Sequence, residues 1–289
     1  MRHLLAADRV RFGRRKDLWL LVALVPAVLL LLFVMEYNAA TTPPNPFIDL
    51  EPPDPVAEAQ IRDQMLGEWH QQVLTELPAF AFPASLVKVA GDTVPLMLLA
   101  IYLSAALVGG EYEWGTVRTI HLTSSRGRTL AVRIGLVAGL VGIAFATALA
   151  LAAIAPFFLT FEGAPLQDYA QPVPNLFWDI ALRVATVLPF VSVPILLAVA
   201  TRSIATSFLL VVLFFVADIA LTGAPFWASS PVPWVPGLTV TGSILRLLGT
   251  SDQLVKDVPA GLSNIALVAW ITLPVVGAIT LFKRQDLTE

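Results

Sequence analysis

Few side chains in this sequence combine residue types and spacings that could perform chemistry. The three histidines, His3, His70 and His121, lie far apart along the chain, and there is no cysteine. The His-Glu-x-x-His zinc pattern and the Gly-Lys pair of a phosphate-binding loop are both absent from the sequence. The sequence therefore predicts that the chain is not an enzyme and carries no catalytic, metal or cofactor site of its own.

A charged segment flanked by glycines is the most distinctive motif of the sequence. From Gly109 to Arg118 it reads Gly-Gly-Glu-Tyr-Glu-Trp-Gly-Thr-Val-Arg, and it lies between two long apolar stretches. The glycines let the backbone turn on both sides of the acidic residues, and the hydroxyl of Thr116 can cap a short following helix. In a membrane protein, such a loop is available to soluble partners. We interpret the segment as a docking element, with an ordinary solvated loop as the alternative.

Two ionisable residues, Arg183 and Asp218, lie inside or at the edge of apolar stretches. Arg183 comes 19 residues before Arg202, and Asp218 comes 16 residues after it. At ~1.5 Å rise per residue, an antiparallel pair of helices would bring both side chains to a similar depth. This spacing predicts an intramembrane ion pair. Separate placement of both residues at the interface and a role in transport stay open as alternatives.

The elements that must position these residues are membrane helices. Hydrophobic residues make up 57% of the sequence and charged residues 13%, against about 25% charged in a typical soluble domain. Continuous uncharged runs approach the ~20 residues that cross a bilayer as a helix, and their continuity favours helices over a barrel. We predict an all-α membrane protein with one transmembrane domain over 1–289 and six spans, at 17–36, 93–109, 134–158, 176–200, 203–222 and 262–282.

The lysines and arginines fall mainly on one side of this six-span frame. The N-terminal tail, the connection 110–133, the turn at Arg202 and the C-terminus carry most of them, and the other side has only Arg62, Lys88, Arg246 and Lys256. Because basic loops stay in the cytoplasm, both termini and 110–133 are expected there, and 37–92 forms an extracytoplasmic loop. The net charge of −3 and the basic inner face do not imply nucleic acid as a partner.

The two segments expected outside contain further helical signals. Asp54-Pro55 is a helix start, and apolar residues recur at every fourth position after it. These residues are Ile61, Met65, Trp69, Val73 and Leu77. The amphipathic helix is expected to pack on the outer ends of the spans, with a lid or an interfacial helix as alternatives. The stretch 223–261 is too apolar for a free loop and too rich in proline to span, which predicts re-entrant short helices in the outer leaflet between spans five and six, one of them over 238–248.

The order of these features resembles the type-2 family of ABC-transporter permeases. The matching features are the basic N-terminal segment, the sizeable outer loop before span two, the motif from Gly109 to Arg118, the Ser-Arg-Gly-Arg run at 125–128 before span three, and the basic ending at Lys283-Arg284. The resemblance implies a permease subunit of an ATP-driven exporter, with six spans, in the cytoplasmic membrane of a bacterium or archaeon.

The resemblance also implies a set of partners and coupling positions. Glu111, Gly115 and Thr116 match the coupling positions of the family, and Glu113 and Arg118 are assigned to the same ATPase-coupling segment, 110–133. ATP and Mg would bind to separate cytosolic ABC ATPase subunits, and a second permease copy or a homologous permease would complete the assembly in the lipid bilayer. A stand-alone secondary transporter and a membrane-embedded sensor are the alternatives, but a secondary transporter normally needs broken helices or buried charges near the midplane.

Overall fold

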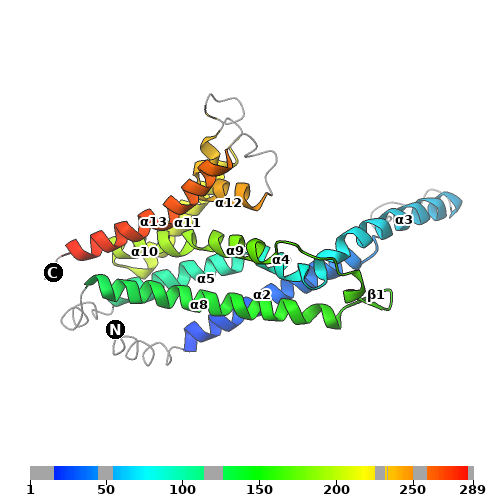
Figure 1. The fold of residues 1–289 in the computed structure, drawn as a ribbon, viewed down its shortest axis with the longest axis horizontal. Helices are drawn as coiled ribbons and strands as arrows, with labels where there is room; N and C mark the ends of the chain where they lie inside the picture. Colours follow the sequence, from blue (N-terminus) through cyan, green and yellow to red (C-terminus); the bar gives the residue numbers. More distant parts are fainter. Residues whose placement is uncertain are drawn as a thin grey trace. The chain divides into compact units, whose positions relative to one another are not determined.

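The computed structural model describes residues 16–44, 55–113, 126–224, 232, 234–249 and 259–285 (Figure 1). Over these residues the regular structure is helical apart from one two-stranded hairpin, which confirms the all-α class. The α-helices are α2 (Lys16–Thr41), α3 (Pro55–Phe80), α4 (Ala84–Gly91), α5 (Val94–Ser104), α6 (Gly110–Glu113), α8 (Arg126–Ile154), α9 (Leu176–Val187), α10 (Pro189–Thr201), α11 (Ile204–Thr222), α12 (Val240–Leu248) and α13 (Ala260–Arg284). The shorter elements are the π-helix η1 (Ala105–Gly109) and the 3-10 helices η2 (Ala155–Phe158), η3 (Leu166–Tyr169) and η5 (Val235–Leu238).

Five stretches in the described part of the chain are long and apolar enough to cross a membrane. They are Leu18–Thr41, Gly127–Phe158, Leu176–Thr201, Ile204–Thr222 and Gly261–Arg284, each matching a predicted span with somewhat different ends. The predicted span 93–109 is also helical, but its apolar part, Val94–Gly109, is shorter than the other five. A sixth candidate by length and composition is the pair formed by α3 and α4, which is bent by 88°. By length and composition, the described residues therefore contain five candidate spans, or six if the bent pair is one span.

The described helices and hairpin belong to two compact units. The first unit comprises Met1–Val25, Thr93–Phe145 and Ala181–Glu289, and the second comprises Pro26–Asp92 and Ala146–Ile180. In the first unit, α10 packs against α5, α11 and α13 (Figure 1). The side chains of Ile195, Ala198 and Val199 in α10 are fully buried. An apolar helix that is covered on several faces is the expected centre of a helix bundle.

The second unit is built around the end of α2 and the long helix α3. The ring of Phe80 lies 5.6 Å from the rings of both Phe33 and Tyr37, and the Tyr37 hydroxyl donates to the carbonyl of Thr160 at 2.8 Å. Lys88 in α4 pairs with Glu36 at 2.6 Å and lies 4.5 Å above the Phe80 ring. Packing of aromatic side chains and one ion pair therefore joins α2, α3 and α4.

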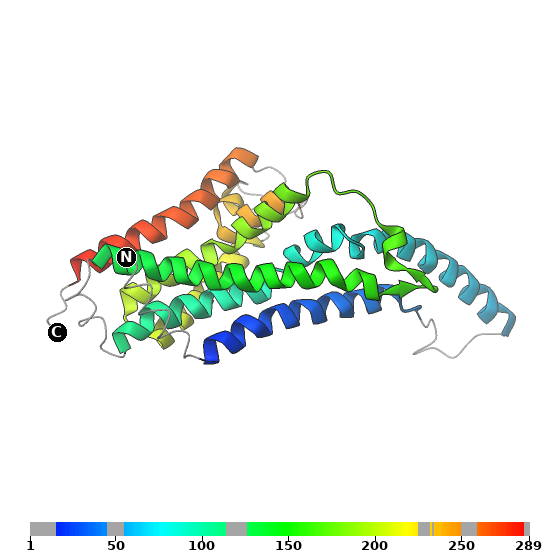
Figure 2. The ribbon, with the colours of Figure 1, turned by 60° about the horizontal axis from the view of Figure 1, so that its bottom comes forward.

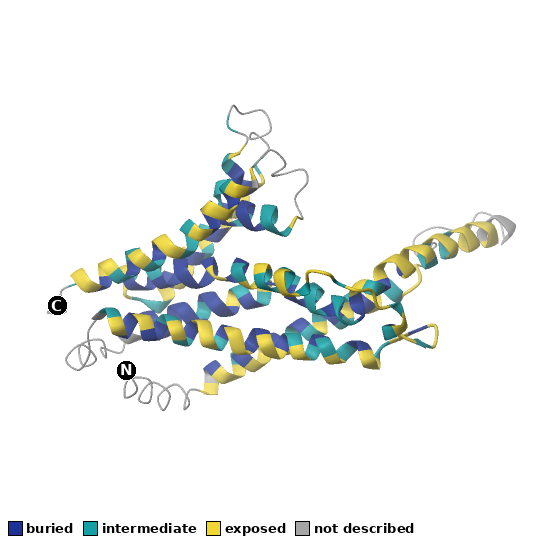
Figure 3. Ribbon diagram, in the orientation of Figure 1, coloured by how far each residue is buried: buried dark blue, intermediate teal, exposed yellow. Residues whose placement is uncertain are grey.

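The amphipathic helix predicted after Asp54 is present as α3, which begins at Pro55. Asp54 itself lies outside the described residues. Burial increases along the helix: Ile61 is exposed, Trp69 is partly covered, and Val73 and Leu77 are buried (Figure 3). The predicted apolar stripe therefore serves as a packing face in the C-terminal half of α3.

A tight hairpin follows the end of α8 in the second unit (Figure 2). Strands β1 (Thr160–Phe161) and β2 (Ala164–Pro165) pair antiparallel through Glu162 and Gly163, both of which have positive φ, as a two-residue turn requires. Phe161 is buried, with its ring 6.3 Å from Trp69 of α3. The hairpin was not predicted from the sequence, and it gives the partly covered face of α3 a second packing partner.

Candidate functional site

The end of the glycine-flanked segment that the structure describes is tied to another helix by a carboxylate. Glu113, the last residue of α6, accepts hydrogen bonds from the backbone N–H of Ile204 at 2.7 Å and from the hydroxyl of Ser203 at 3.1 Å. Ile204 is the first residue of α11, whose first N–H groups have no partner within the helix. A negative charge also interacts favourably with the positive end of the helix dipole. Glu113 is therefore a capping group for α11 supplied by a different helix.

The turn between α10 and α11 is shaped to receive this carboxylate. Arg202 ends α10 with φ of 57° and ψ of 21°, the left-handed conformation that commonly terminates a helix. Ser203 is then extended and caps α11 with its own side chain. Gly109 makes close approach possible, because a Cβ at that position would lie only 3.1 Å from the backbone nitrogen of Ile204. The absence of a side chain at Gly109 therefore lets the helix end reach the turn.

Tyr112 connects the same helix end to the last described turn of the chain. Its hydroxyl donates to Gln285 Oε1 at 2.7 Å, and Gln285 Nε2 donates to the carbonyl of Val199 at 2.8 Å. The Tyr112 ring also meets the ring of Phe282 edge to face, with centroids 6.2 Å apart. Burial raises the pKa of Tyr112 well above its ordinary value of 10.0, and the nearby positive charge of Arg202 opposes this shift only in part. The phenol therefore stays a neutral hydrogen-bond donor.

The helix that leads into this cluster has an irregular turn immediately before it. Residues Ala105–Gly109 form the π-helix η1, all five of them buried. A π-helical turn is rare and is frequently found next to a functional site. The π-helix η1 therefore separates the apolar helix α5 from the charged helix α6 and interrupts the regular α-helical ladder of hydrogen bonds between them.

The structure describes only part of the predicted coupling segment. Glu111 lies in α6, with its backbone described but not its side chain. Gly115, Thr116 and Arg118 lie outside the described residues, so their assignment stays a prediction. The partners of Glu113 were not predicted. The available signal was the Arg-Ser pair at 202–203, which marks a helix end followed directly by a capping residue.

Asp218 forms a second junction between a carboxylate and a helix end in the same unit. Its side chain is buried, and it accepts the backbone N–H groups of Val240 and Thr241 at 2.9 and 2.7 Å. Both groups belong to the first turn of α12, the short helix that was predicted over 238–248. Nearby, the hydroxyls of Thr222 and Thr239 lie 2.6 Å apart. The buried acid is therefore compensated by two helix N–H donors.

The remaining contacts of this junction fix the approach of η5 to α12. The Thr239 hydroxyl accepts the N–H of Gly242 at 2.9 Å, and a Cβ on Gly242 would lie 1.8 Å from the carbonyl oxygen of Pro236. From α13, the indole of Trp270 donates to the carbonyl of Leu238 at 2.8 Å. The backbone N–H groups of Val240 and Thr241 are thus partners of Asp218. The ion pair between Asp218 and Arg183 stays a prediction.

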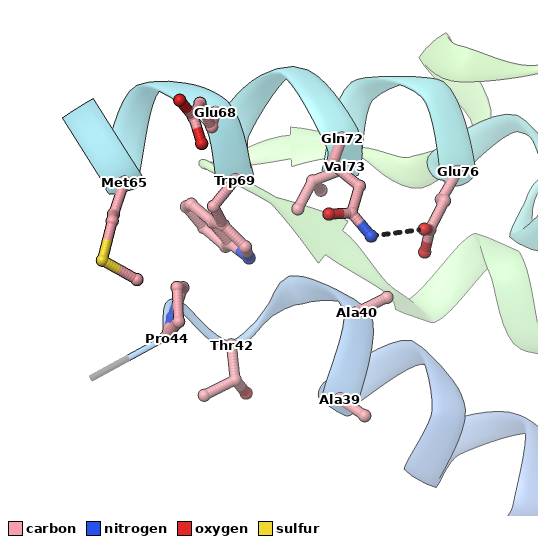
Figure 4. Close-up of a pocket in the computed structure, with 10 residues that line it drawn as sticks. All are labelled: Ala39, Ala40, Thr42, Pro44, Met65, Glu68, Trp69, Gln72, Val73 and Glu76. Carbon is pink, nitrogen blue, oxygen red and sulfur yellow. Dashed lines mark hydrogen bonds between the residues drawn. The ribbon is translucent and has the colours of Figure 1, made fainter. Parts of the chain in front are cut away.

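The second unit contains a pocket of about 360 Å³ between the end of α2 and the middle of α3 (Figure 4). The indole of Trp69 lines it, and the Trp69 N–H is buried with no hydrogen-bond partner among the described residues. Among the described residues that line the pocket, the charged side chains are Glu68 and Glu76, and both are exposed. Gln72 donates to Glu76 at 3.0 Å. The pocket is an open acidic groove rather than an enclosed site. Its other lining residues are Ala39, Ala40, Thr42, Pro44, Met65 and Val73.

The apolar helices and the two capped junctions describe a helical, multi-pass membrane protein. In the described part of the chain no group of three or more acidic or histidine side chains is placed to hold a metal ion. No family model, curated protein or solved structure matches the chain. The geometry of its own residues and the sequence motif must therefore support any functional conclusion.

Proposed function

We propose that this chain is the membrane-spanning permease subunit of an ATP-driven ABC exporter, powered by separate cytosolic ATPase subunits. The observation that carries the proposal is the capping of α11 by Glu113. Glu113 itself belongs to the predicted docking segment, 110–133. A displacement of that segment by a partner would therefore be applied to the end of α6 and, through a charge-assisted contact, to α11.

Two further observations support this assignment. Tyr112 and Gln285 connect the same helix end to α13 and to the end of α10, so three apolar helices converge where the docking segment begins. Convergence of this kind suits a rigid-body movement of helices driven from one point. In the proposed assembly the docking segment and both chain termini face the cytoplasm, two permeases form the membrane part, and ATP with Mg binds only to the ATPases.

The test is purification of the complete complex from native membranes in a mild detergent, followed by native mass spectrometry and an assay of Mg-dependent ATP hydrolysis. We expect two permease chains, two ATPase chains and ATP hydrolysis. A complex that contains this chain alone, with no ATPase, would exclude the proposal and favour a stand-alone secondary transporter.

A variant then tests the role of the coupling contact. Glu113→Ala removes the carboxylate contact with the start of α11, where Ser203 remains as the N-cap, and leaves the other residues of the docking segment unchanged. We therefore expect the ATPase to remain bound and its hydrolysis to lose the dependence on the permease. Glu76→Ala is the matched control, because Glu76 is also an exposed glutamate on a helix but lies on α3. Equal ATPase behaviour of the two variants would contradict a coupling role for Glu113.

A further inference from the structure

We infer that α11 is a relay that connects the docking segment to the short helix α12, through one carboxylate contact at each of its ends. The N-terminal end of α11 is capped by Glu113, and four residues before its C-terminal end Asp218 holds the first turn of α12. All of these residues belong to one compact unit. The relay rests on the proposed function for its purpose, but its contacts need no partner.

The two contacts have the same chemistry. In each, a carboxylate accepts N–H groups that the first turn of a helix cannot satisfy internally. Glu113 accepts one backbone N–H and one hydroxyl, and Asp218 accepts two backbone N–H groups with its two oxygens. Such contacts are directional, because the carboxylate must stay in line with the N–H groups. A shift at one end of α11 must therefore either move the attached helix or break the contact.

The sequence of α11 makes it suitable to carry a displacement. Its 19 residues span ~28 Å at 1.5 Å per residue. They include neither proline nor glycine, the residues at which helices usually kink. By contrast, α10 contains Pro194 and α13 contains Pro274. Of these three helices, α11 is the one whose sequence contains no residue that commonly kinks a helix, so it favours a straight helix.

The far end of the relay is held firmly enough to follow α11. Asp218 and Thr222 lie one turn apart on α11. Asp218 accepts the N–H groups of Val240 and Thr241, the first two residues of α12. The hydroxyl of Thr222 contacts that of Thr239, the residue that caps α12. The Thr222 hydroxyl also donates to the carbonyl of Asp218 at 2.7 Å. These contacts form one connected network at the end of α11. Networks of hydrogen bonds and rigid helices of this kind can carry energetic coupling between distant sites, and the coupling itself is tested by double variants.

Hydrogen exchange of the full chain in lipid nanodiscs, measured by mass spectrometry over residues 240–248, tests the relay without any ATPase. We expect Asp218→Asn to speed exchange at 240–248 about tenfold, because one of the two acceptor oxygens becomes an NH2 donor that cannot accept a backbone N–H. We expect Glu113→Ala to speed exchange in the same residues about threefold, since its contact is exposed and weaker. Glu76→Ala on α3 should leave these residues unchanged.

The double variant Glu113→Ala with Asp218→Asn gives the decisive comparison. If α11 transmits the effect, breaking the Asp218 contact removes the influence of Glu113, and the double variant should match Asp218→Asn within about a factor of two. Acceleration by Glu113→Ala that is confined to 204–210, or independent multiplication of the two effects, would overturn the relay.

Two more variants keep the test independent of protein yield and of other paths. Thr222→Val removes the hydroxyl contact with Thr239, together with the hydrogen bond that the hydroxyl donates to the carbonyl of Asp218 within α11. It replaces Asp218→Asn where that variant folds poorly, and it should reduce the effect of Glu113→Ala at 240–248. An undiminished effect would overturn the relay. Tyr112→Phe removes the hydrogen bond to Gln285 at the end of α13 and keeps the ring contact with Phe282. We expect no change at 240–248, whereas an effect equal to that of Glu113→Ala would assign the path to α13. Failure to find an ATPase in the complex would refute the proposed function and leave this result unaffected.

Discussion

Replacement of Gly242 by alanine should destabilise the junction between η5 and α12. A Cβ at Gly242 would lie 1.8 Å from the carbonyl oxygen of Pro236 and 2.8 Å from the hydroxyl oxygen of Thr239. Ordinary van der Waals contact begins at 3.4 Å, so the carbonyl must move by roughly 1.6 Å, the difference between 3.4 and 1.8 Å. The carbonyl oxygen of Pro236 is a backbone atom, which cannot rotate away as the end of a flexible side chain can.

The size of the effect follows from the hydrogen bonds that such a movement breaks. The N–H of Gly242 would lose the Thr239 hydroxyl at 2.9 Å, and the two N–H groups held by Asp218 would be displaced. Three bonds at about 1 kcal/mol each give about 3 kcal/mol. The lower conformational entropy of alanine in the unfolded chain returns about 0.5 to 1 kcal/mol. We therefore expect a net loss of about 2 kcal/mol.

Thermal unfolding in detergent, followed by intrinsic fluorescence, measures this change. The matched control is Gly139→Ala in α8, where a Cβ would meet nothing within 4 Å. There the alanine should leave the unfolding temperature unchanged or raise it slightly. The argument fails if Gly242→Ala unfolds at the same temperature as the unaltered protein, because the close approach of η5 would then not constrain the position.

Two further predictions concern single contacts in the two units. Burial raises the pKa of Tyr112 above 10.0, so the stability that depends on the neutral phenol is present below pH 10 and is lost as the pH rises further. Above pH 10 the unfolding temperature of the unaltered protein should therefore fall relative to that of Tyr112→Phe. Identical pH profiles of the two proteins would contradict the assignment. Gln167 holds both backbone groups of Phe82, accepting its N–H at 3.2 Å and donating to its carbonyl at 2.8 Å. Gln167→Glu loses the side-chain N–H donor and should weaken protection from hydrogen exchange at 80–91 by about 1 kcal/mol. The control Gln60→Glu, on the exposed face of α3, should leave this protection unchanged. Equal protection in the two variants would refute the role of Gln167.

The sequence predicted the helices well because their signal is local. Continuous apolar runs located the long helices, and the repeat of Val73 and Leu77 located the packing face of α3. The start of that helix at Pro55 and the short helix α12 were also confirmed. The ends were less accurate: α2 continues to Thr41, past the predicted end at residue 36. Polar residues such as Asn38 can continue a helix when packing supports it, so composition alone does not mark the end.

The contacts of the candidate site could not be predicted from the sequence because they are not local. Glu113 was expected in a docking segment, but its partners lie 90 and 91 residues away in the chain. Asp218 was recognised as unusual, but its partners are backbone N–H groups, which carry no signature of residue type. A side chain that pairs with the backbone of a distant helix is therefore found only once the fold is known.

The partners of Tyr112 have a consequence for the order in which the protein is assembled during translation. Gln285 follows Tyr112 by 173 residues, so the ribosome must synthesise nearly all the intervening helices before this bond can form. Until then, Glu113 at the end of α6 can already contact Ser203 and Ile204, but the Tyr112 hydroxyl lacks its acceptor on Gln285. Completion of the cluster is thus a late event of biogenesis. A chain interrupted before α13 would lack this hydrogen bond, although its earlier helices would already have been synthesised.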